Sequence, residues 1–157
     1  MKYQSGFSFI ELIASVVIIG VLATVAVPFV ETTVRREKER ELRVAVRDIR
    51  QAIDAYKVAA SSGKIALRED QSGYPPSLIE LVSGISDVSR PNAPKLYFLR
   101  KIPRDPFHSD ASVPAMKTWG LRSFQSSPDQ PREGDDVFDV YSLSSKTGLN
   151  GVPYAQW

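Results

Sequence analysis

Gly6, Phe7 and Glu11 are the residues near the N terminus whose types and spacing suggest chemistry. If the chain is cut between Gly6 and Phe7, Phe7 gains a free α-amine and Glu11 becomes the fifth residue of the new chain. The amine and the carboxylate then stand at positions i and i+4, one helical turn apart on one face. In a staggered bundle of identical helices, the Glu11 carboxylate of one chain would neutralise the Phe7 amine of the next chain and fix the register.

The segment that must position these groups is a long apolar run. No side chain from Leu12 to Val30 is charged. A helix over residues 7–30 would reach about 36 Å, enough to cross a hydrocarbon core of ~30 Å with some tilt. Only a helix can cross here, because lipid offers no partner to backbone N–H and C=O groups. Glu11 lies near the start of this run, and a carboxylate inside a membrane is expected to have a partner and a role.

The same residues resemble the class III signal of type IV pilins and pseudopilins. The pattern consists of basic Lys2, the Gly6–Phe7 junction, Ser8–Ile13 with Glu11, and Pro28 as the twenty-second residue after the junction. The resemblance implies that a prepilin peptidase cleaves after Gly6 and N-methylates Phe7. It also implies that Glu11 sets assembly and register, and that Pro28 kinks the helix.

Two plainer interpretations of the segment remain open. It could be an ordinary signal peptide cut near Ala26, or a transmembrane anchor with an accidental Glu11. A signal peptide fits poorly, because its n-region would be long and would contain Glu11. The apolar run is also longer than the usual ~7–15 residues.

Composition argues against an enzyme and against nucleic-acid binding. The 157 residues carry a net charge of +2, no cysteine and one histidine, His108. No basic stripe with interleaved aromatic residues appears. There is no thiol nucleophile, Gly-x-Ser-x-Gly turn, phosphate-binding loop or His/Cys metal spacing. We therefore predict a non-enzymatic protein.

Residues 31–60 are predicted to continue the N-terminal helix. Apolar residues recur at a spacing of three or four along one face, which indicates burial: Leu42, Val46, Ile49, Ile53, Tyr56 and Ala60, widened by Ala45, Ala52 and Ala59. The opposite face carries Arg43, Arg47, Arg50, Gln51 and Lys57. The charged run 35–41 contains the helical pairs Arg35–Glu39 and Glu39–Arg43 and is predicted to be a solvated face. Contacts with neighbouring subunits or with lipid headgroups are the alternatives.

The remainder predicts a small α+β head. A turn at Gly73-Tyr74-Pro75 precedes a short helix over 76–82 that stops at Gly84, and strands are predicted over 119–124 and 137–143. Asp105, between two prolines, is predicted to be a turn carboxylate that accepts backbone N–H bonds, and Trp157 an aromatic lid on the core. These landmarks resemble the major, G-type pseudopilin of type II secretion systems, which implies the pilin fold: a long helix packed on a small antiparallel sheet.

The resemblance fails at one place. G-type pseudopilins follow the last strand with an acidic loop that binds calcium, a cation that takes six to eight oxygen ligands. Here the corresponding segment, residues 144–150, has no carboxylate, and Lys146 stands about where the family has a ligating aspartate. We therefore expect no calcium site and no other cofactor. Asp135 and Asp136 are the nearest paired carboxylates and are predicted to lie in a solvated loop.

These observations predict three parts: a leader (residues 1–6), a transmembrane and filament-core helix (7–30) and a periplasmic pilin-like domain (31–157). The resemblance implies a structural subunit of a type II secretion pseudopilus; the alternative is a type IV pilin used in adhesion, motility or DNA uptake. Implied partners are further copies of the chain, prepilin peptidase, minor pseudopilins or pilins, the inner-membrane assembly platform and inner-membrane lipid. The implied orientation has a cytoplasmic N terminus, although Arg35, Arg36, Lys38 and Arg40 oppose it by the positive-inside rule.

Mass spectrometry of the mature N terminus tests the processing prediction. We expect the chain to begin at Phe7, with a methyl group on its amine. An intact Met1, or a cut near Ala26, would remove the filament interpretation.

Overall fold

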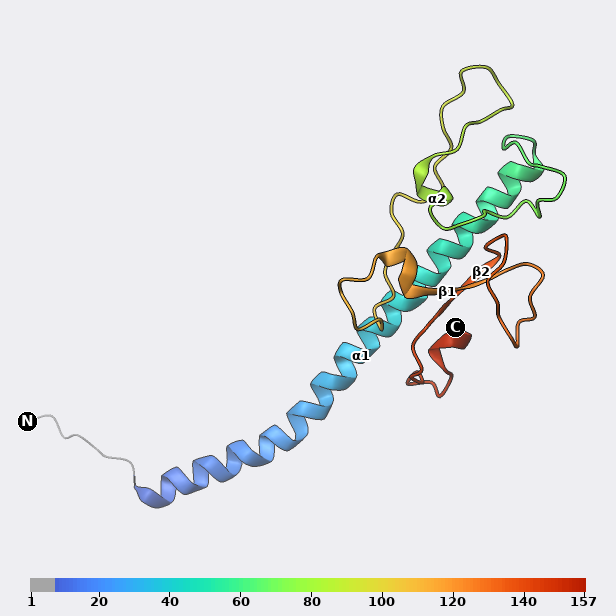
Figure 1. Cartoon of the computed structure of the whole chain (residues 1–157). Helices are drawn as coiled ribbons and strands as arrows, with labels where there is room; N and C mark the ends of the chain where they lie inside the picture. Colours follow the sequence, from blue (N-terminus) through green and yellow to red (C-terminus); the bar gives the residue numbers. More distant parts are fainter. Residues whose placement is uncertain (1–7) are drawn as a thin grey trace, which may run out of the picture. The chain divides into compact units, whose positions relative to one another are not determined.

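The structure, a computed structural model, describes residues 8–157, except for the side chain of Val25. The elements follow in the order α1 (Phe9–Ser61), α2 (Glu80–Ser83), η1 (Ala115–Thr118), β1 (Trp119–Arg122), β2 (Asp139–Ser142) and η2 (Tyr154–Gln156), where η marks a 3₁₀ helix (Figure 1). The contacts divide the chain between Glu37 and Lys38. We call residues 8–37 the stem and residues 38–157 the head. A long helix with a small antiparallel sheet confirms the predicted α+β class.

The head half of α1 forms because its apolar side chains recur once per turn and no glycine or proline interrupts it. The helix ends where predicted: the N–H of Gly63 donates to the carbonyl of Ala60, and that of Lys64 to the carbonyl of Ala59. Gly63 has φ +73°, the left-handed conformation that commonly closes a helix. All predicted stripe residues are buried: Leu42, Ala45, Val46, Ile49, Ala52, Ile53, Tyr56, Ala59 and Ala60.

Strands β1 and β2 form one antiparallel pair that lies beside the head half of α1 (Figure 1). The register places Gly120 opposite Tyr141, and a Cβ at Gly120 would lie 2.3 Å from the tyrosine ring. A side chain there would displace that ring. Both strands are shorter than predicted, because the backbone beyond them bonds elsewhere: Ser123 N–H donates to Arg132, and Val137 N–H to Pro75.

The predicted corner at Gly73-Tyr74-Pro75 turns the chain back toward the core. Gly73 has φ +82°, and the buried Pro75 carbonyl accepts the Val137 N–H just described. The helix that follows covers only Glu80–Ser83, less than the predicted 76–82. The residues before it form turns in which an N–H donates to the carbonyl three residues back, as Glu80 does to Ser77. Its predicted stop at Gly84 holds, with φ +81°.

One apolar core joins these elements. The α1 stripe packs with buried side chains from later parts of the head: Ile65, Leu78, Leu81, Trp119, Val137, Val140 and Tyr154. Trp157 is partly buried against this cluster, as predicted for an aromatic lid. The head is therefore built around one helix face, and its long loops are held to that face by scattered anchors.

Truncating the centre of the stripe should destabilise the head. Ile49 is 0% exposed, so we expect Ile49→Ala to lower the free energy of unfolding by about 2–5 kcal/mol. The measurement is denaturant unfolding of the detergent-solubilised chain, followed by near-ultraviolet circular dichroism. Val44→Ala on the same helix is the control, because Val44 is 45% exposed and should lose less than about 1 kcal/mol. Equal losses in the two variants would contradict the assigned core.

Candidate assembly segment and head network

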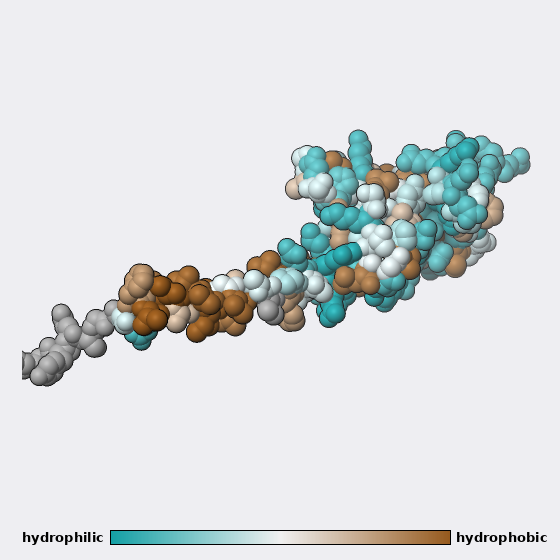
Figure 2. All heavy atoms as spheres, turned by 90° about the horizontal axis from the view of Figure 1, so that it is seen from below, coloured by the Kyte–Doolittle hydropathy of each residue, from teal (hydrophilic) through white to brown (hydrophobic). Residues whose placement is uncertain are grey.

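The stem carries large apolar side chains that are exposed among the described residues. Its hydrophobic side chains range from 45% exposed at Ile13 to 80% at Phe9. In Figure 2 brown, apolar atoms predominate over the first part of this segment, whereas teal, polar atoms are most frequent on the head. Among the described residues, α1 is the one helix long and apolar enough to cross a membrane, and none of its most apolar window is buried. Such a surface requires lipid or other apolar helices around it.

Glu11 lies in the first turn of α1, where the helix dipole favours a negative charge. Glu11 is exposed, and its backbone carbonyl accepts a hydrogen bond from Ser15 Oγ at 2.8 Å. Gly6 and Phe7 lie outside the described residues. The cleavage, the methylation and the pairing of Glu11 with the Phe7 amine therefore stay predictions.

Pro28 lies inside α1, which continues through it to Ser61. Proline lacks the N–H that would bond one turn back, so its neighbourhood loses one helical hydrogen bond. Hydroxyl groups close by bond to the helix backbone: Thr32 Oγ1 donates to the Pro28 carbonyl at 2.8 Å, and Thr33 Oγ1 to the Phe29 carbonyl at 2.9 Å. The kink predicted at Pro28 stays a prediction.

The head begins with a buried carboxylate that the sequence did not lead us to expect. Glu39 is 5% exposed, although the run 35–41 was predicted to be a solvated face. Its Oε1 accepts hydrogen bonds from the Leu149 N–H at 2.8 Å and from the Tyr154 hydroxyl at 2.9 Å. Its Oε2 lies 4.0 Å from Arg43, so the predicted Glu39–Arg43 pair is confirmed. The sequence spacing could have predicted this burial, because Glu39 lies three residues before Leu42 and so extends the buried stripe by one turn.

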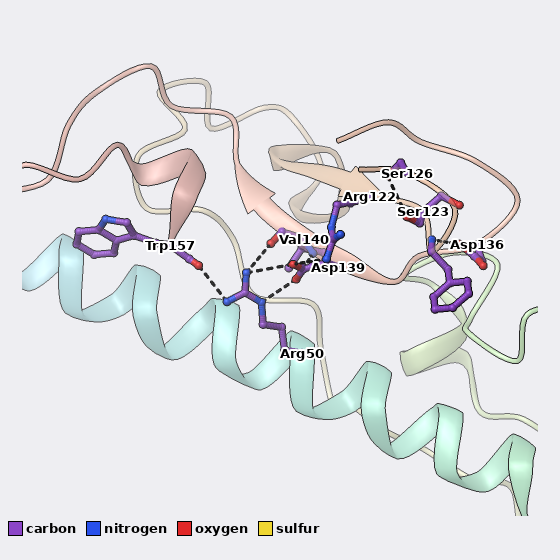
Figure 3. A network of polar contacts seen from close by, with 9 residues as sticks. Arg50, Arg122, Ser123, Ser126, Asp136, Asp139, Val140 and Trp157 are labelled. Carbon is purple, nitrogen blue, oxygen red and sulfur yellow. Dashed lines mark hydrogen bonds and ion pairs between the residues drawn. The ribbon is translucent and has the colours of Figure 1, made fainter. Parts of the chain in front are cut away.

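A second carboxylate, Asp139 of β2, joins the helix to the sheet, and Arg50 extends this network to Trp157. Arg50 of α1 donates through Nε to Asp139 Oδ1 at 2.7 Å, and Arg122 of β1 through Nη2 to Oδ2 at 3.4 Å. Arg50 Nη1 also donates to a backbone oxygen of Trp157 at 2.9 Å (Figure 3). Arg50 was predicted to lie on the outer face of the helix. It is half-buried, because its long side chain reaches around to the sheet.

Asp136 holds the loop between the strands. It is buried, contrary to the predicted solvated loop, and its Oδ1 accepts the Phe124 N–H at 2.9 Å (Figure 3). Burial alone would raise the pKa of Asp136. Hydrogen bonds from Ser72, the Phe124 N–H and Ser123 outweigh that effect and lower the pKa below its usual value. The neighbouring Asp135 is exposed, so the prediction holds for one member of the pair.

Asp105 is a turn carboxylate, as predicted, but its role is wider. Its Oδ1 accepts the Phe107 N–H at 2.8 Å, which closes the proline corner. Its Oδ2 accepts the Ser142 hydroxyl at 2.5 Å, and its own N–H donates to Thr118 Oγ1 at 3.1 Å. Asp105 is 1% exposed and thus fastens the corner to β2 and η1 inside the core.

His108 does not assemble a nucleophile triad with the described residues. Its Nδ1 is buried and has no hydrogen-bond partner within residues 8–157. The nearby Ser112 hydroxyl donates to Asp110 Oδ1 at 2.7 Å, so this serine is bound to the acid and not to the imidazole. A triad needs the histidine between the two. The described residues also contain no group of three or more His, Cys, Asp or Glu side chains suited to a metal ion.

The chain is similar to proteins of known type. Residues 1–27 match the family model described as the prokaryotic N-terminal methylation motif. Over 151 residues the chain is 27% identical to the type II secretion system core protein G of Klebsiella pneumoniae, covering 93% of this chain and 100% of that protein. The core protein G of Pseudomonas aeruginosa is 28% identical over 148 residues, covering 92% and 85%. No solved structure matches the chain.

A methylation motif, an apolar helix and an α+β head are features of the pilin-like class of proteins, and the chain resembles that class in all three. Within that class it resembles the core G proteins of type II secretion systems over nearly its whole length. The core protein G of Dickeya chrysanthemi, at 25% identity, covers 96% of this chain and 94% of its own length. The similarity to G-type pseudopilins predicted from sequence is therefore confirmed.

Removing the shared acceptor of Arg50 and Arg122 should loosen the head. The Asp139 side chain is 23% exposed, so solvent replaces its bonds only in part. We expect Asp139→Ala to lower the free energy of unfolding by about 1.5–3 kcal/mol. Denaturant unfolding measures this loss. Asp129→Ala, in an exposed loop, is the control, and a loss at Asp139 no larger than at Asp129 would contradict the assigned network.

Proposed function

We propose that the chain is a structural subunit of a type II secretion pseudopilus. In this proposal a prepilin peptidase cleaves after Gly6 and methylates Phe7, and the stem helices of many copies then pack into a filament. The observation that supports it most strongly is the stem: an apolar helix whose large hydrophobic side chains are exposed, in a chain whose residues 1–27 match the N-terminal methylation motif. The names of the relatives, type II secretion system core protein G, support the secretion role.

The stem has two successive environments in this account. Before assembly it spans the inner membrane, with the N terminus in the cytoplasm and the head in the periplasm. After extraction, the stems of other copies replace lipid around it. Lipid and a bundle of apolar helices are both solvents for the same side chains, so the stem can be transferred without refolding.

Glu11 gives the transfer its direction. In lipid the carboxylate is costly, whereas in the filament it meets the Phe7 amine of a neighbouring copy. Removing one partner of an ion pair that is shielded from water strongly destabilises the assembly, because the other charge then stays uncompensated. Glu11 would thus favour the assembled state and fix the axial position of each copy.

The head contributes scaffolding in this proposal, with neither a catalytic centre nor a resident cofactor. Two carboxylates of the head are engaged in structural bonds: Asp105 with Ser142, and Asp139 with Arg50 and Arg122. Prepilin peptidase, the inner-membrane assembly platform and minor pseudopilins are the partners that this role requires.

A type IV pilin of an adhesion, motility or DNA-uptake pilus is the second candidate. The stem and its motif fit both equally well. The absence of cysteine argues for the secretion role, because many pilins close a C-terminal loop with a disulfide. Gene neighbourhood separates the two: a secretin and an assembly ATPase of secretion type favour the pseudopilus, and a retraction ATPase favours the pilus.

Substitution of Glu11 tests the assembly role. We expect Glu11→Ala to enter the membrane normally but to assemble poorly, because it leaves the Phe7 amine unpaired at a cost of about 3–5 kcal/mol per contact. The measurement compares the yield of sheared filaments with the amount of membrane-inserted subunit. Ser15→Ala is the matched control: it lies one turn along the same stem and loses only a hydrogen bond within its own helix.

A normal filament yield from Glu11→Ala would count against the proposal. So would an equal loss from Ser15→Ala, since the effect would then belong to any change in the stem.

A further inference from the structure

The loop between β2 and η2, residues 143–153, contains no helix or strand. It contains no Asp or Glu. Its backbone bonds include Gly148 N–H to the Val152 carbonyl at 2.8 Å and Gly151 N–H to the Gly148 carbonyl at 3.0 Å, and Thr147 forms an isolated bridge with Pro153. Side-chain oxygens of Ser144 and Asn150 accept the N–H groups of Lys146 at 3.3 Å and Val152 at 3.1 Å. Most of these bonds join residues close in sequence. We call this segment the C-terminal loop. A loop of this length needs an additional anchor to hold one conformation.

The anchor comes from the helix. Glu39 Oε1 accepts two bonds, one from the Leu149 N–H at 2.8 Å within the loop and one from the Tyr154 hydroxyl at 2.9 Å just after it. Hydrogen bonds to an ionised acceptor are about twice as strong as neutral ones. Because Glu39 is 5% exposed, water competes little for this carboxylate. One side chain of α1 therefore fixes both the middle and the end of the loop.

The position of the Tyr154 hydroxyl is itself fixed by packing. Tyr154 is 1% exposed; its ring stacks on Phe107 with centroids 4.0 Å apart, and the edge of Trp157 meets it at 5.0 Å. The backbone N–H of Tyr154 also donates to the Lys146 carbonyl at 3.1 Å. Glu39 thus receives a donor that the core has already oriented, which makes the bond less costly in side-chain entropy.

A calcium ion does not fit this loop. Calcium requires six to eight oxygens with several carboxylates among them. The loop offers hydroxyls, carbonyls and the cationic Lys146, and the carboxylate bonded to it, Glu39, already accepts two bonds through one oxygen. Arg43 lies 4.0 Å from the other oxygen and adds positive charge.

We infer that Glu39 performs for the C-terminal loop the organising role that a divalent cation performs in an acidic loop. The negative charge comes from α1, and the loop provides the donors. The conformation of the loop is then set when the head folds and does not depend on the calcium concentration around the cell. This inference concerns the head alone, so it can fail or succeed whether or not the chain forms a filament.

Thermal unfolding of the full chain in detergent tests the inference, with near-ultraviolet circular dichroism reporting on the packed Tyr154 and Trp157. We expect the same midpoint in excess EDTA and in millimolar calcium chloride. We expect Glu39→Ala to lower the midpoint by about 5–10 °C, because two bonds to a charged acceptor are lost. Glu39→Gln retains an acceptor oxygen and should lose less.

Glu41→Ala is the matched control, because Glu41 is exposed two residues further along the same helix and should leave the midpoint unchanged. If Glu39→Ala does not fold, Tyr154→Phe is the second variant, because it removes one of the two bonds and keeps the ring. A Tyr154→Phe midpoint below that of the wild type supports the anchor. The inference is overturned if calcium raises the wild-type midpoint, or if Glu39→Ala and Tyr154→Phe melt like the wild type.

Discussion

The stem of α1 presents apolar side chains that nothing else in the described chain covers. Phe9 is 80% exposed and Phe29 73%, so burying them supplies a driving force that the head cannot satisfy. The same helix continues into the head, where its stripe, from Leu42 to Ala60, is fully used in a core. The two halves of one helix therefore differ: the second half is buried in a core on one face, whereas the first half presents exposed apolar side chains.

The head depends on that helix because regular structure elsewhere is sparse. Two four-residue strands and three short helical segments cannot fix the long connections by ladder bonds alone. Buried or half-buried carboxylates do this instead, each accepting bonds from a segment distant in sequence. Glu39 holds residues 149–154, Asp105 holds Ser142, and Asp139 joins α1 to β1. Each of these acids has its donors in place, so the cost of burying it is offset.

The helix, its buried stripe, the fold class and the approximate strands follow from periodicity and turn residues in the sequence. The polar anchors do not, because a side chain such as Arg50 or Asp136 finds its partner only once the chain has closed. Glu39 is the instructive case. The run of charges around it indicated a solvated face, whereas its spacing from Leu42 indicated burial, and the spacing was correct. The pairing of Glu11 stays a prediction from the sequence, since its expected partner belongs to another copy of the chain.

The most direct test of the central claim is the distance between Glu11 and the Phe7 amine of a different copy in the assembled polymer. Solid-state NMR can measure it in filaments grown from two pools, one labelled with nitrogen-15 at phenylalanine and the other with carbon-13 at glutamate. The account predicts a dipolar coupling between the Phe7 amine and the Glu11 carboxylate carbon that corresponds to an ion pair, about 3–4 Å. Intact filaments without that coupling would contradict it.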